Sequence, residues 1–592
     1  MNEDYHRDSL QHQILEFCRH IAGSAKIIAV SQLCNKPSAI PDEKAPLEIT
    51  LVARDFQPRL MSYVKTFSGR TVIVSAVDQW IYERDVDRGF LGEALASALI
   101  FPYTSVCGED YLHKREIALK KRLILESLEN LILSFPELSY RLHIKPHYFM
   151  YEVILNRVRI FPPLAYGLSN VLNGSANENE VESVFQGYME ALGQLEREGK
   201  IVLFNGYVTI PKKTVVESQN PKTRLTNISK NAPRTIFTSL FASFPQLINF
   251  FSQSTEAILK LKFQLKRPPD LIPRFLNPQK YLYVPTAKGL ISLADRLNID
   301  TFARKILLNG ERSEIKYEPI GGVLNDLYLI RARQKDKEKK VLVKRFKDWS
   351  GFKWFPLSLW SLGARTFAVL GRSRLARECA ISEFLRCEGI NVPKILHVSH
   401  NERLVFMEFI EGEDLSKTIR NISLGAKKED GAELAKIAQV GEIFAKVHSL
   451  GITLGDTKPE NVIVDPNDRI YLLDFEQASH DGDKAWDLAV FLYYSGHYLQ
   501  PMYSNGKATS IAKAFINGYL KGGGDLSTIK KAGASKYTRV FSVFTMPSII
   551  LAMSNVCKKT GQRSEEYGEK QDHFNLLWRS RQNRRKQDLT SG

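Results

Sequence analysis

The first part of the chain alternates short apolar runs with stretches of helical spacing. Three runs have the composition of buried strands: residues 27–30, 47–52 and 71–74. Such alternation, with helical segments between the runs, is typical of an α/β unit. Farther along, leucines recur at helical spacing and stop near Pro136, since proline cannot continue a helix. We therefore expect an α/β domain over residues 1–110 and a helical segment over residues 111–176.

A third pattern combines one helix with a hairpin. Helical spacing ends near Leu195, and two β-favouring runs follow, joined by Asn205 and Gly206. Asn-Gly between two such runs is a strong hairpin signal. A helix leading into a hairpin resembles a winged helix-turn-helix, so we expect a winged-helix-like unit over residues 177–214. Such a unit binds nucleic acid in some proteins and is a packing module in others, and the pattern leaves both open.

The composition of the chain changes again in its remaining part. Residues 215–310 begin rich in Asn, Ser, Thr, Lys and Pro and continue with aromatic residues, which predicts a linker and helical region. A new series of short strands begins near Ile315, and we place a further domain at residues 311–560. Residues 561–592 carry clustered arginines and predict a basic C-terminal tail.

Composition and charge say more about the binding partners of the protein than about its fold. A chain of 592 residues exceeds one core, and its 44% hydrophobic and 25% charged residues are ordinary for globular domains. The net charge of +17 favours an anionic partner, such as nucleic acid, an anionic membrane surface or a polyphosphate. It fits a basic soluble protein without such a partner equally well.

Cysteine usage and apolar runs bear on location. Six scattered cysteines without a Cys-x-x-Cys pair argue against a disulfide framework and a zinc knuckle, and predict a cytoplasmic protein. The two longest apolar stretches, residues 235–251 and 540–556, are shorter than the roughly 20 residues that a bilayer requires. We expect buried helices there and no transmembrane segment.

The domain predicted at residues 311–560 begins with strands on either side of a glycine turn. One strand ends at Gly321 and Gly322, and the next begins near Leu327. Glycine lets backbone N–H groups approach phosphate oxygens, although paired glycines between strands usually mark a plain hairpin. A third strand ends at Lys344, and a lysine at the end of a buried strand is costly unless it meets an anion. Two glutamates on the helix predicted at residues 373–387 could provide it.

The most specific chemistry lies in Asp-Thr-Lys-Pro-Glu-Asn at residues 456–461. Asp474 follows Asn461 by 13 residues and is itself followed by phenylalanine. Phosphoryl transfer needs a carboxylate that orients the attacking hydroxyl, oxygen ligands for Mg²⁺, and a cation near the transferred group. Asp456 can supply the carboxylate, Asn461 and Asp474 the metal ligands, and Lys458 the cation.

Taken in order, the glycine turn, strand lysine, helix glutamate and catalytic loop resemble the protein-kinase superfamily. The resemblance covers about residues 315–496 and is nearest to the compact atypical branch: RIO-type kinases, the archaeal KEOPS-complex kinase and lipopolysaccharide kinases. Gly455 before the catalytic aspartate is typical of that branch. The resemblance implies an α+β multidomain chain with a bilobal kinase fold at its C-terminal end, and ATP and Mg²⁺ or Mn²⁺ as cofactors.

The resemblance also implies residue roles around the nucleotide. Lys344 would contact the α- and β-phosphates, and the turn at Gly321 and Gly322 would cover them. Glu378 would hold Lys344. We prefer it to Glu383 because its interval to the next glycine matches compact archaeal kinases, although a surface salt bridge remains the alternative for either glutamate.

Two further roles follow from the same resemblance. The segment at Glu408 and Phe409 resembles the hinge between kinase lobes, where backbone groups would bind the adenine edge. Asp487 matches the buried aspartate that supports the catalytic loop, which is a structural role.

Several residues depart from the kinase pattern. Glu476 replaces the glycine of Asp-Phe-Gly and puts an extra carboxylate near the metal ligands, and Leu454 replaces the usual histidine. The interval from Asp474 to Asp487 is too short for a full activation segment, so the usual docking of a protein substrate is in doubt. An aromatic insert at residues 349–370 is either core packing or a docking surface.

The N-terminal half faintly resembles a minimal nucleotidyltransferase. It lacks that family's Gly-Ser turn and spaced acidic pair. An acidic cluster surrounds Trp80 and consists of Asp78, Glu83, Asp85 and Asp87. We interpret it as a solvated helix face and assign no catalysis to it.

Three hypotheses follow for the whole chain. The leading one is an atypical serine/threonine protein kinase that transfers the γ-phosphate of ATP to a protein hydroxyl. The second keeps the fold and makes the acceptor a small molecule, such as a sugar or lipid. The third is a nucleic-acid-binding scaffold, acting through the winged-helix-like unit and basic tail, whose kinase fold is an ATP-dependent switch.

Overall fold

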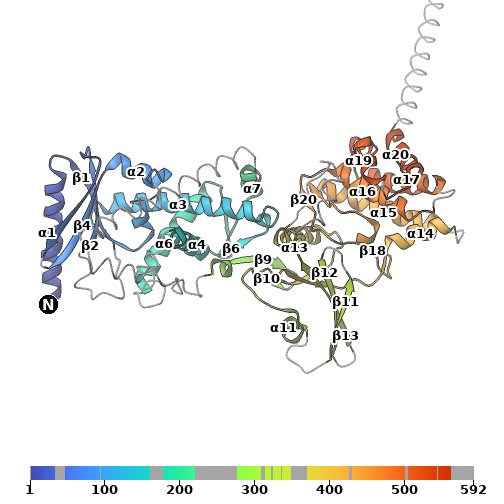
Figure 1. Cartoon of the computed structure of the whole chain (residues 1–592), viewed down its shortest axis with the longest axis horizontal. Helices are drawn as coiled ribbons and strands as arrows, with labels where there is room; N and C mark the ends of the chain where they lie inside the picture. Colours follow the sequence, from blue (N-terminus) through green and yellow to red (C-terminus); the bar gives the residue numbers. More distant parts are fainter. Residues whose placement is uncertain are drawn as a thin grey trace, which may run out of the picture. The chain divides into compact units, whose positions relative to one another are not determined.

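The computed structural model divides the chain into two units, and Figure 1 shows their elements. Unit 1 comprises residues 1–284 and 292–294, and unit 2 comprises residues 285–291 and 295–592. The described residues are 2–33, 47–67, 69–91, 93, 95–160, 178–219, 277–307, 314–321, 325–334, 337–348, 370–425, 430–500, 505–542 and 544–561. The central part of the predicted linker, the aromatic insert and the basic tail lie almost entirely outside these ranges.

The first sheet of unit 1 has the strand order β3-β4-β2-β1-β5. Its strands are β1 (Lys26–Leu33), β2 (Leu47–Arg54), β3 (Leu60–Phe67), β4 (Arg70–Asp78) and β5 (Tyr103–Cys107). The three predicted apolar runs form β1, β2 and β4, of which β2 and β4 are parallel. The expectation of a helix between β2 and β4 is wrong. An edge strand, β3, pairs with β4 there, and an edge strand needs no continuous apolar run.

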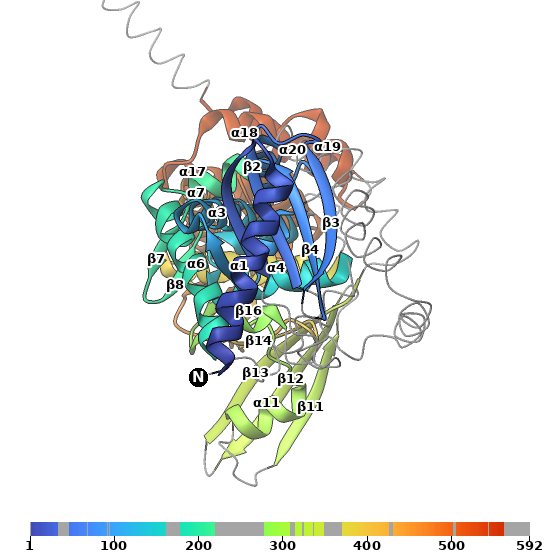
Figure 2. The ribbon, with the colours of Figure 1, turned by 90° about the vertical axis from the view of Figure 1, so that its left-hand side faces the viewer.

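Helix α1 (Asn2–Ala22) crosses one face of this sheet (Figure 2). Its buried side chains Ile14 and Cys18 share a core with Val30, Leu51 and Val72 from three strands. Side chains on a strand alternate between the two faces, so these residues form the apolar face that the helix covers.

The acidic cluster near Trp80 is not a solvated face throughout. Asp85 of α2 (Gln79–Arg88) is fully buried, and its carboxylate accepts hydrogen bonds from four backbone N–H groups: those of Leu91, Glu93, Leu95 and Ala96. Asp78 caps the N-terminus of α2 by accepting from the Trp80 N–H. The interpretation is therefore wrong for Asp78 and Asp85, whose carboxylates satisfy buried backbone donors.

The rest of unit 1 combines helices with strands of a second sheet of order β10-β9-β6-β8-β7, in which residues 285–291 are counted with unit 2. Its strands are β6 (His143–Ile144), β7 (Val202–Phe204), β8 (Tyr207–Thr209), β9 (Leu282–Thr286) and β10 (Gly289–Ser292). The helices are η2 (Ala96–Ile100), α3 (Glu109–Ser134), η3 (Leu138–Tyr140), α4 (His147–Ile160), α6 (Glu178–Arg197), α7 (Lys212–Gln219) and η4 (Pro278–Tyr281). The predicted hairpin is confirmed, with Asn205 and Gly206 at φ of 50° and 76°. The winged-helix-like unit stays a prediction.

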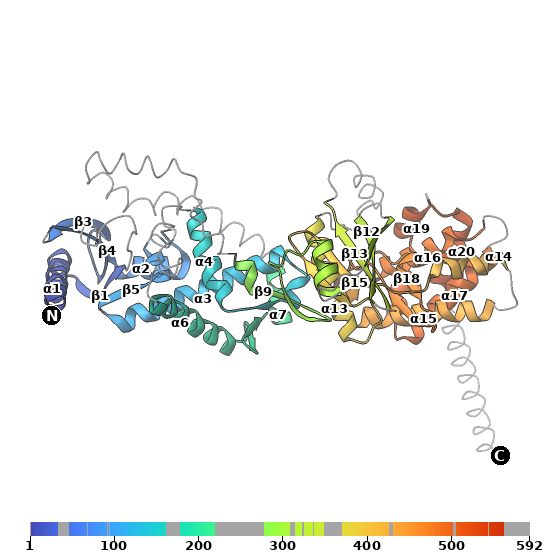
Figure 3. The same ribbon diagram turned by 90° about the horizontal axis from the view of Figure 1, so that it is seen from below.

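The sheet of unit 2 has the order β11-β12-β13-β15-β14, and all its neighbours are antiparallel. Its strands β12, β13 and β15 are labelled in Figure 3. Its strands are β11 (Ile315–Gly321), β12 (Asn325–Gln334), β13 (Lys337–Phe346), β14 (Ile395–Ser399) and β15 (Leu404–Glu408). One face packs on α11 (Ile299–Phe302) and η5 (Ala303–Leu307), where the Phe302 ring stacks 3.9 Å from Phe406. Helix α13 (Gly371–Cys387) supplies residues that contact the end of β13.

The C-terminal part of unit 2 is mainly helical. Its helices are α14 (Leu415–Leu424), α15 (Asp430–Ser449), η6 (Pro459–Asn461), α16 (Lys484–His497), α17 (Asn505–Lys521), α18 (Leu526–Ala532), α19 (Ser535–Phe541) and α20 (Pro547–Lys559). Short strands form two small sheets: β16 (Glu413–Asp414), β18 (Val462–Val464) and β19 (Ile470–Leu472) in one, β17 (Ile452–Thr453) and β20 (Ser479–His480) in the other. The backbones of helices α15 and α17 pack closely against each other at Gly518. A Cβ atom at this position would lie only 1.9 Å from the Ala438 carbonyl oxygen.

The units thus have mixed helix and sheet content, as an α+β chain does. Within the ranges that the structure describes, no helix is long and apolar enough to cross a membrane. Residues 540–556 include the end of α19 and most of α20, which are partly buried helices, whereas residues 235–251 lie outside the described ranges.

Candidate active site

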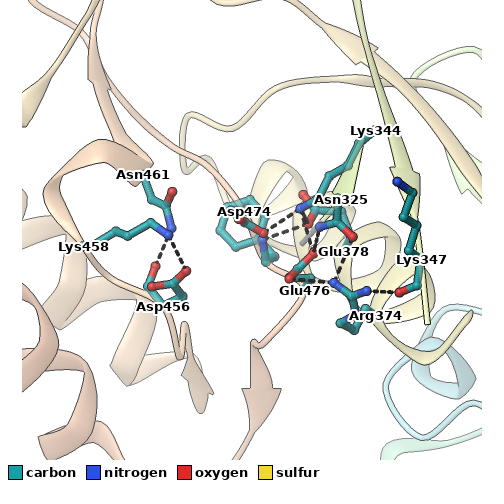
Figure 4. Close-up of polar contacts among 11 residues, drawn as sticks. Asn325, Lys344, Lys347, Arg374, Glu378, Asp456, Lys458, Asn461, Asp474 and Glu476 are labelled. Atoms are coloured by element: carbon teal, nitrogen blue, oxygen red, sulfur yellow. Dashed lines mark hydrogen bonds and ion pairs between the residues drawn. The ribbon is translucent and has the colours of Figure 1, made fainter. Parts of the chain in front are cut away.

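Lys344 reaches the site because of strand alternation on β13. Val341 and Val343 point into the core on the α11 face, so Leu342 and Lys344 point to the opposite face. The Lys344 Nζ atom lies 3.1 Å from a Glu378 oxygen and 2.6 Å from an Asp474 oxygen (Figure 4). This side chain is only 7% exposed, and the carboxylates around it compensate for the cost of burying its charge.

A third carboxylate, that of Glu476, lies 3.1 Å from the same Nζ atom. Burial alone would lower the pKa of the Lys344 ammonium, but Asp474, Glu378 and Glu476 together raise it well above its ordinary value. The group is therefore held as a cation, the form that attracts phosphate.

Helix α13 provides Glu378, and the structure separates it from the competing Glu383. Glu383 pairs with Arg386 on its own helix at 2.7 Å, whereas Glu378 contacts Lys344 and accepts a hydrogen bond from the Phe475 N–H at 3.1 Å. Burial raises the pKa of Glu378 to about 7, against the opposing effect of the Lys344 charge. Glu378 is thus the glutamate that joins α13 to β13 and to the segment after β19.

Asp474 lies just after β19 with a left-handed backbone, at φ of 63°. This conformation is uncommon for residues other than glycine, although aspartate adopts it more readily than most, and the Asp474 carboxylate here accepts a hydrogen bond from Lys344. Burial would raise the pKa of Asp474, but Lys344 and Lys458 lower it below its ordinary value. The carboxylate is consequently held in its charged, cation-binding form.

The catalytic loop brings three predicted residues together. Lys458 Nζ lies 3.0 Å from an Asp456 oxygen, and the Asn461 side-chain amide donates to the Asp456 backbone carbonyl at 2.8 Å. Burial raises the pKa of Asp456, while Lys458 opposes the shift. The Asp456 carboxylate is a stronger base than an exposed aspartate, which suits a group that accepts a proton.

Asp487 supports this loop from within the helical part. It is fully buried at the start of α16, and its carboxylate accepts hydrogen bonds from Leu454 N–H at 2.6 Å and Gly455 N–H at 2.7 Å. His448 Nε2 lies 3.1 Å from the same carboxylate. Gly455 has φ of 87°, a conformation open to glycine, so the residue before Asp456 can turn sharply there.

These side chains line one cavity of about 420 Å³. Its lining includes the following predicted residues: Lys344, Glu378, Glu408, Phe409, Asp456, Lys458, Asn461 and Asp474. Its apolar lining comes from both parts of unit 2 and includes Leu327, Leu342, Met407, Ile463 and Leu473. Of the other predicted residues, Asp487 lies beneath the loop, Gly321 ends β11 and does not line the cavity, and Gly322 is outside the described residues.

Comparison with known proteins identifies the family. Residues 333–489 match the lipopolysaccharide kinase (Kdo/WaaP) family. The probable serine/threonine-protein kinase BUD32 homolog of Archaeoglobus fulgidus is 31% identical over 160 residues, which are 27% of this chain and 72% of that protein. The C-terminal region belongs to the atypical branch of the protein-kinase superfamily. The resemblance inferred from the sequence is therefore confirmed for this kinase domain.

Two other relatives match shorter stretches of the chain. The KEOPS complex subunit Bud32 of Pyrococcus abyssi is 30% identical over 112 residues, 19% of this chain and 48% of that protein. The probable bifunctional tRNA threonylcarbamoyladenosine biosynthesis protein of Methanocaldococcus jannaschii is 31% identical over 123 residues, 20% of this chain and 21% of that protein. The matched part of the chain thus spans about half the length of the Pyrococcus protein.

The donor set of the kinase domain fits a cation that arrives with phosphate. Asp474 and Asn461 offer a carboxylate and an amide oxygen, the hard ligands that Mg²⁺ prefers. Among the described residues, no group of three or more His, Cys, Asp or Glu side chains is arranged to hold a metal by itself. Mg²⁺ is commonly bound by one or two carboxylates together with substrate phosphates, which is the case that these residues fit.

Three residues of the kinase domain were not assigned roles from the sequence. His448 touches Asp487, and Arg374 and Asn325 both bind Glu476. The sequence marks Glu476 as unusual, because a carboxylate stands there in the place of a glycine. Nothing in the local sequence indicates the roles of His448, Arg374 and Asn325, because each contacts a residue far away in the chain.

Proposed function

We propose that the kinase domain is an ATP-dependent phosphotransferase that moves the γ-phosphoryl group of Mg²⁺-ATP onto a hydroxyl. The observation that carries the proposal is the convergence of Lys344, Asp456, Asn461 and Asp474, from three separate segments, on one cavity. The mainly β half and the mainly helical half of unit 2 would be the two lobes of a bilobal kinase, with the cavity between them.

The cavity lining supports one orientation of the nucleotide. Its apolar residues suit a purine ring, and the backbone at Glu408 and Phe409 would bind the adenine edge. The phosphates would then lie at Lys344, a buried cation of the cavity. Mg²⁺, held by Asn461 and Asp474 with phosphate oxygens, would neutralise charge on the transferred group.

The catalytic loop supplies the remaining steps. Asp456 would orient the acceptor hydroxyl and accept its proton, for which its raised pKa is suited. Lys458 contacts Asp456 and would stabilise negative charge on the phosphoryl group as it moves. Asp487 would fix the loop by binding the N–H groups of Leu454 and Gly455.

The acceptor that we propose is a serine or threonine hydroxyl of a protein. The support is the Archaeoglobus relative, which is named a probable serine/threonine-protein kinase and is matched over 72% of its length. A sugar hydroxyl is the second candidate, because the family model that matches is that of lipopolysaccharide kinases. Incubation of the protein with labelled ATP, followed by separate analysis of protein and small-molecule products, distinguishes the two acceptors.

We also propose an anionic partner for the chain outside the kinase site. A nucleic acid is favoured by the net charge of +17 and by the exposed Lys212 and Lys213 that follow the β7–β8 hairpin. The Pyrococcus relative is named as a subunit of a complex, which supports protein partners as well.

The test of the phosphotransferase proposal is Mg²⁺-dependent ATP turnover in matched variants. Asp456→Asn and Asp474→Ala should each abolish turnover, because the proton acceptor and a metal ligand are lost. Asp468→Asn is the control, since Asp468 is 76% exposed at the tip of the β18–β19 hairpin. Unchanged turnover in both site variants would contradict the proposal.

A further inference from the structure

Glu476, the residue in the place of a glycine, is buried in a cluster of polar side chains. We call Asn325, Arg374 and Glu476 the Glu476 cluster. The Asn325 side-chain N–H donates to Glu476 Oε2 at 2.6 Å, and Arg374 donates to Glu476 Oε1 at 3.0 Å. Arg374 also donates to Asn325 Oδ1 at 2.9 Å, which closes a three-membered ring of hydrogen bonds (Figure 4).

The burial of the Glu476 cluster shows that it is part of the folded interior. Arg374 is 0% exposed, Glu476 is 4% exposed and Asn325 is 8% exposed. A buried guanidinium and a buried carboxylate are stable only as a well-matched pair, and loss of either partner is costly. Arg374 also donates to the Lys347 backbone carbonyl and so joins α13 to the end of β13.

Two contacts from α13 hold residues 474–476: one belongs to the Glu476 cluster, and the other comes from Glu378. Arg374 and Glu378 are four residues apart and lie on the same face of the helix. Arg374 binds the Glu476 side chain, and Glu378 accepts from the Phe475 N–H at 3.1 Å. The two residues that follow Asp474, Phe475 and Glu476, are therefore both attached to α13.

The cluster also reaches the nucleotide cavity from the phosphate side. Asn325 is the first residue of β12, the strand that pairs with β11, and both Asn325 and Glu476 line the cavity. Glu476 Oε2 receives the Asn325 N–H and lies 3.1 Å from Lys344 Nζ. One carboxylate oxygen thus contacts both the first residue of β12 and the lysine that would bind phosphate.

We propose that Glu476 is a positioning residue for the nucleotide: through Arg374 and Asn325, it fixes residues 474–476 and the start of β12 around Lys344. The proposal rests on the proposed function, since it concerns binding of ATP in the same cavity. A glycine would leave this segment able to rotate. The carboxylate holds it in the single arrangement in which Asp474 and Lys344 face the cavity together.

The hydrogen-bond pattern explains why a carboxylate is required. Both oxygens of Glu476 accept, one from Arg374 and one from Asn325. The amide introduced by Glu476→Gln would turn a donor toward one of these donors, and rotation of the Asn325 amide only moves the conflict to Arg374. Loss of one such charge-assisted bond corresponds to about a tenfold change in an equilibrium constant.

The experiment measures affinity for Mg²⁺-ATP by titration calorimetry, and the KM for ATP, in full-length variants. We expect Glu476→Gln to weaken affinity and raise KM about tenfold, because residues 474–476 and the start of β12 are released. Glu383→Gln is the matched control. It removes another buried carboxylate of the same region that pairs with an arginine, but Glu383 does not line the cavity. Its affinity should stay within about twofold of the wild type.

A second variant separates positioning from loss of folding. Asn325→Asp combined with Glu476→Gln moves the carboxylate across the hydrogen bond: Arg374 and the introduced amide again have acceptors, and Lys344 keeps its contacts with Glu378 and Asp474. We expect this double variant to recover most of the affinity that each single variant loses. Amide exchange gives a readout without nucleotide: the Phe475 N–H should lose protection in Glu476→Gln and keep it in Glu383→Gln.

The outcomes keep this proposal apart from the proposed function. Binding of Mg²⁺-ATP by the wild type with equal affinity in Glu476→Gln overturns the positioning role and leaves the phosphotransferase proposal standing. Additive losses in the double variant also overturn it, because they show no pairing between the two positions. A wild-type protein that neither binds nor hydrolyses ATP removes the proposed function itself, and the positioning role with it.

Discussion

Asp487→Asn is the substitution that tests most directly how the catalytic loop is held. The two carboxylate oxygens accept from the Leu454 N–H at 2.6 Å and the Gly455 N–H at 2.7 Å, in a fully buried position. An asparagine keeps one acceptor oxygen and turns its NH₂ group toward the other N–H. One hydrogen bond to a charged group is lost and one backbone donor is left buried, which costs about 3 kcal/mol of unfolding free energy.

The same change should lower catalysis per folded molecule. Gly455 directly precedes Asp456, so a released Gly455 N–H lets the Asp456 carboxylate move, and a displacement of about 1 Å in a reacting group costs about 100-fold in rate. The assay combines urea unfolding with ATP turnover at a temperature where the variant is folded. Asp483→Asn is the control, because Asp483 caps the same helix and asparagine caps equally well. A loss below about 1 kcal/mol with unchanged turnover would refute the proposed role of the carboxylate.

Three further predictions use other parts of the chain. Gly518→Ala should cost more than about 2 kcal/mol of unfolding free energy, because the added methyl group would meet the Ala438 carbonyl at 1.9 Å, whereas Gly506→Ala has open space and should cost little; urea unfolding compares them. Burial lowers the pKa of His397 to about 4, so the unfolded chain binds its proton first, and stability should fall as pH drops from about 6.5 to about 4. His397→Phe should flatten that part of a melting-temperature profile, and an identical profile would contradict the assignment. Lys212→Glu with Lys213→Glu should weaken retention on RNA or DNA and reduce its salt dependence, which a filter-binding titration at several salt concentrations measures.

Local sequence patterns were sufficient where one segment carries the whole signal. The spacing of Asp456, Asn461 and Asp474 follows from a short loop and a strand hairpin, so the chemistry could be inferred before the geometry was known. A lysine at the end of a buried strand likewise predicts an anionic partner, and Lys344 contacts three carboxylates. Glu378 was preferred to Glu383 by interval alone, and the structure pairs Glu378 with Lys344.

Contacts between distant segments were beyond the reach of such patterns. Asn325 and Glu476 are 151 residues apart, and Arg374 and Glu476 are 102 residues apart. Nothing in the residues around Arg374 distinguishes a fully buried arginine from a surface arginine on an amphipathic helix. Asp85 shows the same limit in unit 1, because its acidic neighbours suggest a solvated face while its backbone partners lie 6 to 11 residues farther along.

The departures from the kinase pattern make sense together when they are traced to α13. A glycine after Asp-Phe would leave Asp474 and the helix free to move separately, but Arg374 and Glu378 hold both Glu476 and Phe475. A displacement of α13 away from both β13 and residues 475–476 therefore breaks the Arg374–Glu476 pair and the Lys344–Glu378 pair, and each is a buried ion pair whose rupture is costly. The short interval from Asp474 to Asp487 offers little chain to absorb such a movement. The arrangement thus favours a site that is assembled in the folded protein over one assembled by movement of this segment.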